Sequence, residues 1–153
     1  MQTFLPYRSF QSSARVLDRA RLGKQRVETL QIMKALVTDE GWVNHPVTKM
    51  WRGYEGALLS YQWYICKEWQ RRGYKDTCWE KTRDLYYPAQ IDRQFRRGNV
   101  LLPPFIGLKR FHSVHRANLL RKDPEWYGRF NWPEEPAEGY WYPVIDSRGR
   151  LVR

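Results

Sequence analysis

This chain of 153 residues lacks the features that mark membrane and secreted proteins. No apolar run approaches the roughly 20 residues that a membrane-spanning helix needs. The start, M-Q-T-F-L-P-Y, has neither the charged nor the apolar segment of a signal peptide. Two cysteines, Cys66 and Cys78, are too few for a disulfide framework and too far apart in the sequence for a metal-binding pair. We therefore expect a reduced, cytoplasmic protein that does not associate with membranes.

Familiar catalytic signatures are also missing. The chain has no G-x-x-x-x-G-K phosphate loop, no G-x-G-x-x-G motif and no nucleophile elbow. His112 and His115 would share a helix face that His45 could approach, but no Cys or acidic residue stands at ligand spacing. We predict no metal and no cofactor, with one of the paired histidines in the core or at a cap and the other on phosphate. Cys66 is interpreted as a buried, inert thiol rather than a nucleophile.

Positive charge and aromatic side chains, in contrast, are abundant. The chain has 27 Lys and Arg against 16 Asp and Glu, a net charge of +11. Such a charge favours a polyanionic partner, and nucleic acid is the commonest one. The aromatic content of 16% suits stacking on bases, but it equally suits a small core that gains much burial from few residues. We expect most individual rings to lie in the core.

Apolar periodicity predicts a mostly α fold, a single compact domain over residues 1–153 with three main helices. We expect residues 1–8 to be extended, Ser9 or Ser12 to cap a short helix leading to Leu17, and Asp18 to cap the next helix. The main helices are expected to run to about Val37, with Gly41 at the C-terminal cap, from Pro46 to Arg72, and over Leu108–Arg121. Shorter elements are predicted at Thr77–Arg83 (helix), Tyr86–Pro88 (loop), Gln90–Arg97 (helix) and Asp123-Pro124 (a capped turn). The tail is irregular and rich in proline and aromatics, with at most a hairpin around Ser147–Gly149.

The stretch L-D-R-A-R-L-G-K-Q-R-V-E, residues 17–28, carries unusual charge for a helix. Arg21, Lys24 and Glu28 fall on one side of it, and Arg26 projects among apolar residues, where a cation should be paired or functional. Gly23 costs a helix about 1 kcal/mol relative to alanine and allows another backbone to approach closely. The stretch is either a solvated amphipathic face or a phosphate-binding surface that contains a carboxylate and an amine. The core stripe is expected to consist of Leu22, Leu30, Met33, Leu36 and Val37.

The amine of Met1 is a further chemical candidate. An α-amino group titrates near pH 8, about two units below a lysine side chain, so part of it is neutral and nucleophilic at physiological pH. Such an amine can attack a sugar C1′ or a carbonyl and form an imine. A frayed terminus is the alternative. Because Gln2 is a large residue, we expect Met1 to be retained.

Three blocks, in this order, resemble one family over about residues 12–130. Residues 17–28 resemble the charged first helix of the phage endonuclease V type pyrimidine-dimer DNA glycosylases. The block P-V-T-K-M-W-R-G-Y-E-G-A-L-L-S-Y-Q-W-Y-I-C-K-E-W-Q-R-R-G-Y, residues 46–74, is similar to their central helix, and His45 just before it also fits. The block R-F-H-S-V-H-R-A-N-L-L-R-K-D-P-E-W-Y-G-R-F, residues 110–130, resembles their third helix and the W-Y that follows it.

The resemblance implies a glycosylase and abasic-site lyase that binds duplex DNA and flips a base. We also expect the protein to be a monomer and to be associated with the nucleoid when it is bound to DNA. It implies that the N-terminal amine, here that of Met1, attacks C1′ and that a first-helix glutamate assists. The family's Arg-Glu pair does not align cleanly: if Arg26 matches the arginine, Glu28 lies one position late. An alignment without gaps places Lys24 where the acid is expected. We favour Glu28 as the acid and keep Lys24 as an alternative amine.

Two other functions stay open on the sequence: a nucleic-acid-binding module without catalytic activity, and an enzyme that acts on a free nucleoside or nucleotide. For DNA contacts, the candidates are cationic, polar and aromatic side chains on or near the three blocks. They are Arg15, Arg19, Arg21, Gln25, Arg26, His45, Arg52, His112, His115, Arg116, Trp126 and Tyr127.

Overall fold

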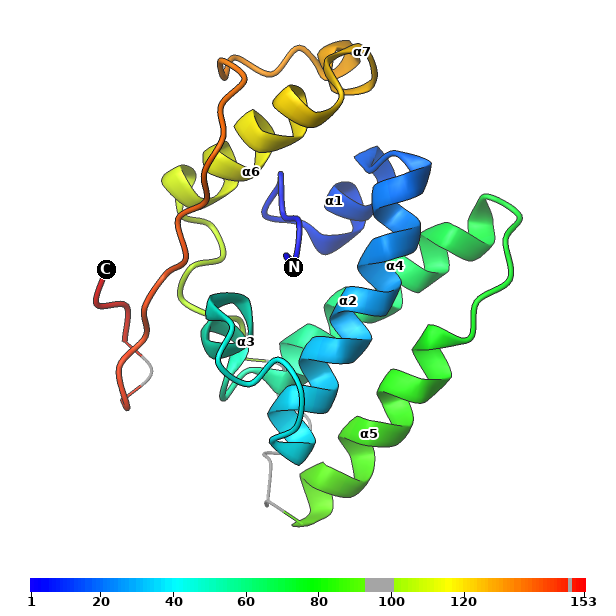
Figure 1. Ribbon diagram of the computed structural model, residues 1–153, viewed down its shortest axis with the longest axis vertical. Helices are drawn as coiled ribbons and strands as arrows, with labels where there is room; N and C mark the ends of the chain where they lie inside the picture. The colour runs from blue at the N-terminus through cyan, green and yellow to red at the C-terminus, as the bar shows by residue number, and fades with distance from the viewer. Residues whose placement is uncertain (93–100, 149) are drawn as a thin grey trace.

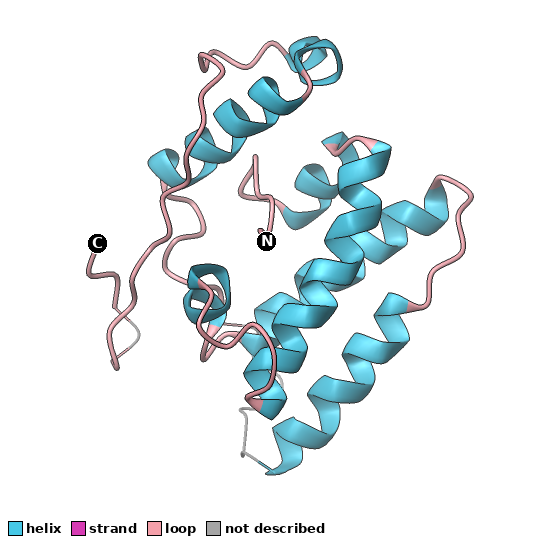
Figure 2. Ribbon diagram, in the orientation of Figure 1, coloured by secondary structure: helices cyan, strands magenta, loops and turns pink. Residues whose placement is uncertain are grey.

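The computed structural model describes residues 1–92, 101–148 and 150–153, and it is mostly helical, as predicted (Figure 1). In this part of the chain the only β-type pairing is an isolated antiparallel bridge between Ile145 and Leu151, so Figure 2 shows helices and loops alone. The helices are α1 (Phe10–Val16), α2 (Arg19–Thr38), α3 (Pro46–Trp51), α4 (Glu55–Arg71), α5 (Cys78–Asp92), α6 (Lys109–Lys122) and α7 (Pro124–Tyr127), followed by the 3-10 turn η1 (Gly128–Phe130).

One hydrophobic core joins the helices α1 to α7. Helices α2, α4 and α5 pack against one another, α1 packs on α4, and α6 leads directly into α7. Trp51, Tyr61, Phe105, Phe111 and Tyr127 are the largest side chains that are fully buried. Most of the other aromatic rings lie in the same core or pack against it. The aromatic content therefore serves mainly to fill a small domain, as expected.

Local capping residues start the helices where the sequence places them. Ser9 accepts a hydrogen bond from the amide of Ser12 at the start of α1, and Asp18 accepts one from the amide of Arg21 at the start of α2. Asp123 caps α7 in the same way through the amide of Trp126. The end of α2 differs from the prediction. Asp39, and not Gly41, takes the left-handed conformation at the C-terminal cap, with φ of 56°.

The prediction of one long helix from Pro46 to Arg72 is wrong. The chain forms α3 and α4 instead, separated at Arg52–Tyr54 by Gly53, which has φ of 87°. The carboxylate of Glu55 accepts a hydrogen bond from the amide of Gly53 at 3.1 Å and stabilises this turn. Glycine has low helix propensity and adopts positive φ without steric cost. The apolar periodicity continues across the break because both helices face the same core.

The predicted loop at Tyr86–Pro88 is also wrong, because α5 continues through it. Tyr86 and Ala89, on either side of Pro88, are both buried. Burial of these side chains in the packing against α2 and α4 outweighs the single backbone hydrogen bond that proline removes. Residues 93–97 of the helix predicted at Gln90–Arg97 lie outside the described part of the chain.

The tail after η1 runs alongside α6 and returns towards α3 (Figure 1). Its backbone is tied to α6 by two hydrogen bonds, from the amide of Ala137 to the carbonyl of Ala117 and from the side chain of Asn118 to the carbonyl of Gly139. Near its end, the amide of Val152 donates to the carbonyl of Val144, and the amide of Val144 donates to the carbonyl of Arg153. The described part of the tail holds no helix or named strand after η1, and two of its residues, Tyr140 and Tyr142, form one wall of the site described next.

Candidate active site

The N-terminal segment is buried rather than frayed. Residues 2–6 are all buried, and the N–H groups of three of them donate to side chains from α2 and α6. Gln2 donates to Glu28 at 2.7 Å, Phe4 donates to Gln25 at 3.0 Å, and Leu5 donates to Nδ1 of His115 at 2.8 Å. These partners come from two helices far apart in the sequence.

The oxygen atoms of the same segment are bound as well. The hydroxyl of Tyr61 donates to the carbonyl of Phe4, and Arg116 donates to the carbonyl of Pro6, both at 2.8 Å. The indole of Trp51 donates to the hydroxyl of Thr3 at 3.0 Å. Chain termini are normally poorly ordered unless they are tied down. This one is held along its length, so the position of Met1 is set by the core.

Several predicted DNA contacts are anchors of this segment. His112 donates from Nδ1 to the carbonyl of Leu5 and accepts from the amide of Gly107 at Nε2, so its ring is neutral. His115 is fully buried, and its Nδ1 accepts a hydrogen bond from the amide of Leu5. We expected one of these histidines on phosphate, but the structure places both in the core. Gln25 is buried in the same way, and Tyr127 is buried with its hydroxyl on Asp18.

The buried histidines predict a loss of stability in mild acid. Burial lowers the pKa of His115 from 6.5 to about 3, and neighbouring His112 adds to the effect. Below pH 6.5 the unfolded chain takes up a proton that the folded chain refuses, so the free energy of unfolding falls by about 1.4 kcal/mol per pH unit. We expect urea denaturation to show a loss of about 2 kcal/mol from His115 between pH 6.5 and pH 5.

The variant His115→Gln is the control for this prediction, because its amide can still accept from the amide of Leu5 but does not titrate. Between pH 5 and 6.5, the slope of its free energy of unfolding against pH should be smaller than that of the natural chain. The difference should correspond to about one bound proton. An identical free energy of unfolding for the natural chain at both pH values would contradict a buried, neutral His115.

A cavity of about 350 Å³ opens where the N-terminal segment meets α2. Met1, Lys24 and Glu28 all line it. Oε2 of Glu28 accepts from the amide of Gln2 at 2.7 Å, and its Oε1 lies 3.7 Å from Nζ of Lys24. The Glu28 side chain is only 13% exposed, whereas that of Lys24 is 76% exposed. The structure thus brings Met1, Lys24 and Glu28 to one cavity.

His45 lies beside this group. Its Nδ1 accepts from the amide of Val47 at 3.1 Å and caps α3. Burial lowers the pKa of His45, the charge of the Met1 amine lowers it further, and Glu28 acts in the opposite direction. His45 is therefore within electrostatic reach of both groups and is held mainly in its neutral form at neutral pH.

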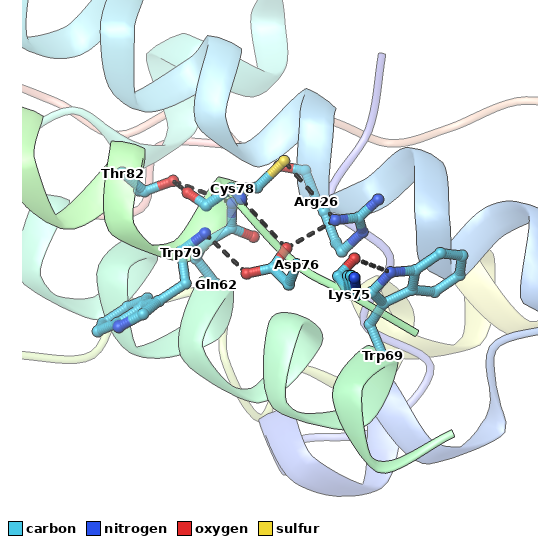
Figure 3. A network of polar contacts seen from close by, with 8 residues as sticks. All are labelled: Arg26, Gln62, Trp69, Lys75, Asp76, Cys78, Trp79 and Thr82. Atoms are coloured by element: carbon cyan, nitrogen blue, oxygen red, sulfur yellow. Dashed lines mark hydrogen bonds and ion pairs between the residues drawn. The ribbon is translucent and has the colours of Figure 1, made fainter. Parts of the chain in front are cut away.

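Arg26 does not line the cavity; it is paired inside the protein with Asp76, just before α5 (Figure 3). Its guanidinium lies 2.7 Å from the carboxylate of Asp76 and 4.4 Å from the centre of the Trp69 ring. Burial raises the pKa of Asp76, but hydrogen bonds from Arg26 and from two backbone amides outweigh this and hold it below its usual value. Trp69 also lies close to Gly23, where we had expected room for another backbone. A Cβ added at Gly23 would lie 3.0 Å from the Trp69 ring.

The remaining predicted DNA contacts divide into exposed and internal groups. Arg15, Arg19 and Arg52 are exposed, and Arg21 lines the cavity while pairing with Asp18 at 3.1 Å. Two candidates make hydrogen bonds inside the protein. Arg116 donates to the carboxylate of Glu134 and to the carbonyl of Pro6, and the indole of Trp126 donates to the carbonyl of Val16.

Six further residues line the cavity that we did not predict from the sequence. They are Gln2, Phe4, Ala20, Lys122, Tyr140 and Tyr142. The aromatic run Y-W-Y at residues 140–142 was visible in the sequence, but nothing in it indicates that the tail folds back over α2. Within the described residues, no group of three or more His, Cys, Asp or Glu side chains is placed to hold a metal ion. None of the described helices has the length and apolarity to span a bilayer.

Comparison with known families supports the resemblance seen in the sequence. The family model described as pyrimidine dimer DNA glycosylase matches residues 1–81, which is more than half of the chain. The match includes Met1, Lys24, Glu28 and His45, whereas the resembling block at residues 110–130 lies beyond it. Comparisons with curated proteins and with solved structures gave no match. With its N-terminal segment and its first long helix inside the matched region, the chain belongs to the pyrimidine dimer DNA glycosylase family, a family of DNA repair enzymes.

Proposed function

We propose that this chain removes a damaged base from duplex DNA and then cleaves the strand, using the amine of Met1 to form an imine with the sugar. The convergence of Met1 and Glu28 on one cavity carries the proposal. The amide of Gln2 is 2.7 Å from the Glu28 carboxylate. Only three covalent bonds separate that amide nitrogen from the Met1 amine, so the amine is held within a few ångströms of the carboxylate.

The proposed chemistry begins with attack of the neutral amine on C1′ of the damaged nucleotide. The amine lone pair forms the new N–C1′ bond, and the glycosidic bond breaks with its electron pair on the departing base, which takes up a proton. Loss of the amine proton and opening of the sugar ring give an imine between Met1 and C1′. Removal of a C2′ proton then expels the 3′ phosphate, and water finally hydrolyses the imine and frees the amine.

Glu28 is the group placed to assist these steps. Its carboxylate is largely withdrawn from solvent, at 13% exposure, where a negative charge stabilises a developing cationic sugar more strongly than in water. We propose that the same carboxylate accepts protons from the attacking amine and from C2′. The hydrogen bond from Gln2 fixes its orientation. Glu28 is therefore proposed as both electrostatic stabiliser and proton acceptor.

Cations at the mouth of the cavity are suited to hold the DNA backbone. Arg21, Lys24 and Lys122 line the cavity, and Arg15 and Arg19 are exposed nearby in sequence, at the end of α1 and the start of α2. Phosphate contacts of this kind position the duplex without reading its sequence. We propose this surface as the DNA-binding face and Lys24 as a phosphate contact rather than the nucleophile, because the Lys24 side chain is 76% exposed whereas Met1 is half-buried.

The test is to incubate the full chain with borohydride and three duplexes: one irradiated with ultraviolet light, one with an abasic site, and one undamaged. Borohydride reduces an imine to a stable amine, so we expect a covalent protein–DNA adduct with the first two duplexes and none with the third. Binding to all three without any adduct would reject the imine mechanism and favour a binding module without catalysis. Turnover of free nucleosides without DNA would instead favour an enzyme that acts on a free nucleoside or nucleotide.

A further inference from the structure

A second, larger cavity of about 780 Å³ adjoins the first. Tyr140 and Tyr142 line both cavities, so one aromatic wall from the tail separates them. The other side chains that matter here are Lys49, Arg110 and Trp141, and we call this cavity the tail groove. Its aromatic wall lies beyond residue 81, where the match to the family ends.

The tail groove combines cations with aromatic faces. The guanidinium of Arg110 lies 4.2 Å from the centre of the Trp141 ring, and Lys49 and Arg153 add positive charge. No Asp or Glu is among its described lining residues. Nor does any described carboxylate lie within ion-pair distance of Lys49 or Arg110. The groove is therefore suited to an anionic ligand with flat, stackable groups.

This combination points to unpaired nucleotides rather than to a duplex. Bases inside a duplex already stack on their neighbours, so a duplex surface is held mainly through its phosphates. Unpaired bases instead gain stabilisation by stacking on aromatic rings and on arginine planes, while nearby cations hold the backbone. The half-buried rings of Tyr142 and Trp141, with Arg110 stacked on the latter, provide such a platform.

The platform is also formed in advance of binding. Gly139 and Ala137, just before the aromatic run, are hydrogen bonded to α6, and Pro143, just after it, is buried. Arg110 belongs to the first turn of the same helix. A rigid site loses little conformational entropy when a ligand binds. The tail therefore acts as a fixed wall rather than a loose extension.

We propose that the tail groove binds single-stranded DNA next to the reacting nucleotide, so that the enzyme also acts on lesions and abasic sites in unpaired DNA. The strand would pass from the Met1–Glu28 cavity over Tyr140 and Tyr142 into the groove. The catalytic part of this inference rests on the proposed function, whereas the binding part does not.

The binding part is tested with a fluorescent oligothymidylate and the full chain. Trp141→Ala should weaken binding of the oligonucleotide by about tenfold, the effect expected for loss of one stacked base. Trp141→Phe should restore much of it, and Arg110→Met, which removes the cation but keeps an apolar stem, should also weaken binding. Trp63→Ala is the matched control, because Trp63 is an exposed tryptophan beside a cation, Lys67, on α4 and does not line the groove.

The catalytic part compares borohydride trapping rates on abasic single strands and abasic duplexes. We expect Trp141→Ala to lower the rate on the single strand by about tenfold and the rate on the duplex by less than about twofold. Thermal unfolding midpoints of all variants show whether the tail remains folded. Equal losses on both substrates, or oligothymidylate binding by Trp141→Ala and Arg110→Met that matches the natural chain, would overturn the proposal. If no substrate is trapped at all, the proposed function fails, and the oligothymidylate measurement still decides the groove.

Discussion

Adding two residues, Gly-Ser, before Met1 should abolish the covalent adduct with abasic DNA. The extended chain keeps an α-amino group but moves it out of the position that the anchored N-terminal segment gives it beside Glu28. Positioning of a nucleophile against its target accounts for large factors in rate, so we expect a loss of about a thousandfold or more in the trapping rate. Borohydride trapping on an abasic duplex, quantified by gel shift of the labelled strand, measures this directly.

The variant Lys24→Gln is the matched control for the amine. It removes the other candidate nucleophile at the cavity and leaves Met1 unchanged. We expect it to weaken duplex binding modestly and to reduce the slope of log affinity against log salt concentration by about one. Trapping should be retained. Undiminished trapping by the extended chain, together with loss of trapping by Lys24→Gln, would instead identify Lys24 as the nucleophile and end the case for Met1.

Replacing Glu28 by glutamine should reduce single-turnover excision by about a hundredfold or more, in line with the contribution of a general acid or base. The glutamine amide oxygen can still accept from the amide of Gln2, so the N-terminal segment should stay in place. What is lost is the negative charge beside the sugar and the group that accepts protons. Excision from an ultraviolet-irradiated duplex, measured with enzyme in excess, gives the rate, and a salt titration gives the binding.

Glu40→Gln is a suitable control, because Glu40 is an exposed carboxylate just after α2, away from the cavity. It changes the net charge by the same amount as Glu28→Gln and should leave the excision rate unchanged. Duplex binding by Glu28→Gln should be largely intact, and its thermal midpoint should be close to that of the natural chain. Unchanged excision by Glu28→Gln would remove Glu28 from the mechanism.

Helix boundaries were predicted well where they depend on neighbouring residues and poorly where they depend on packing. The caps at Ser9, Asp18 and Asp123 involve side chains that bond three residues ahead, so the sequence reveals them. The break at Gly53 and the continuation of α5 through Pro88 depend instead on how the helices pack. Apolar periodicity concealed the turn at Gly53, and burial of Tyr86 and Ala89 overrode the usual effect of Pro88.

The site was only partly visible for the same reason. The charged stretch at residues 17–28 and the amine of Met1 were singled out from residue chemistry, and the fold brings both to one cavity. The roles of the histidines and of Arg26 were not visible. His115 binds a backbone amide 110 positions away, and Arg26 pairs with an aspartate 50 positions away. No local pattern encodes such partners, because they exist only after the helices have packed.

By itself, then, the sequence determined the helical character, the caps, the strong positive charge and the family, since these follow from short-range propensity, composition and local blocks of residues. Only the tertiary structure decided which polar side chains stay exposed to solvent and which hold the N-terminal segment, because burial decides between a protein partner and solvent. It also decided that the tail closes the cavity with Tyr140 and Tyr142. Those contacts join the two ends of the chain through a core that the sequence pattern does not specify.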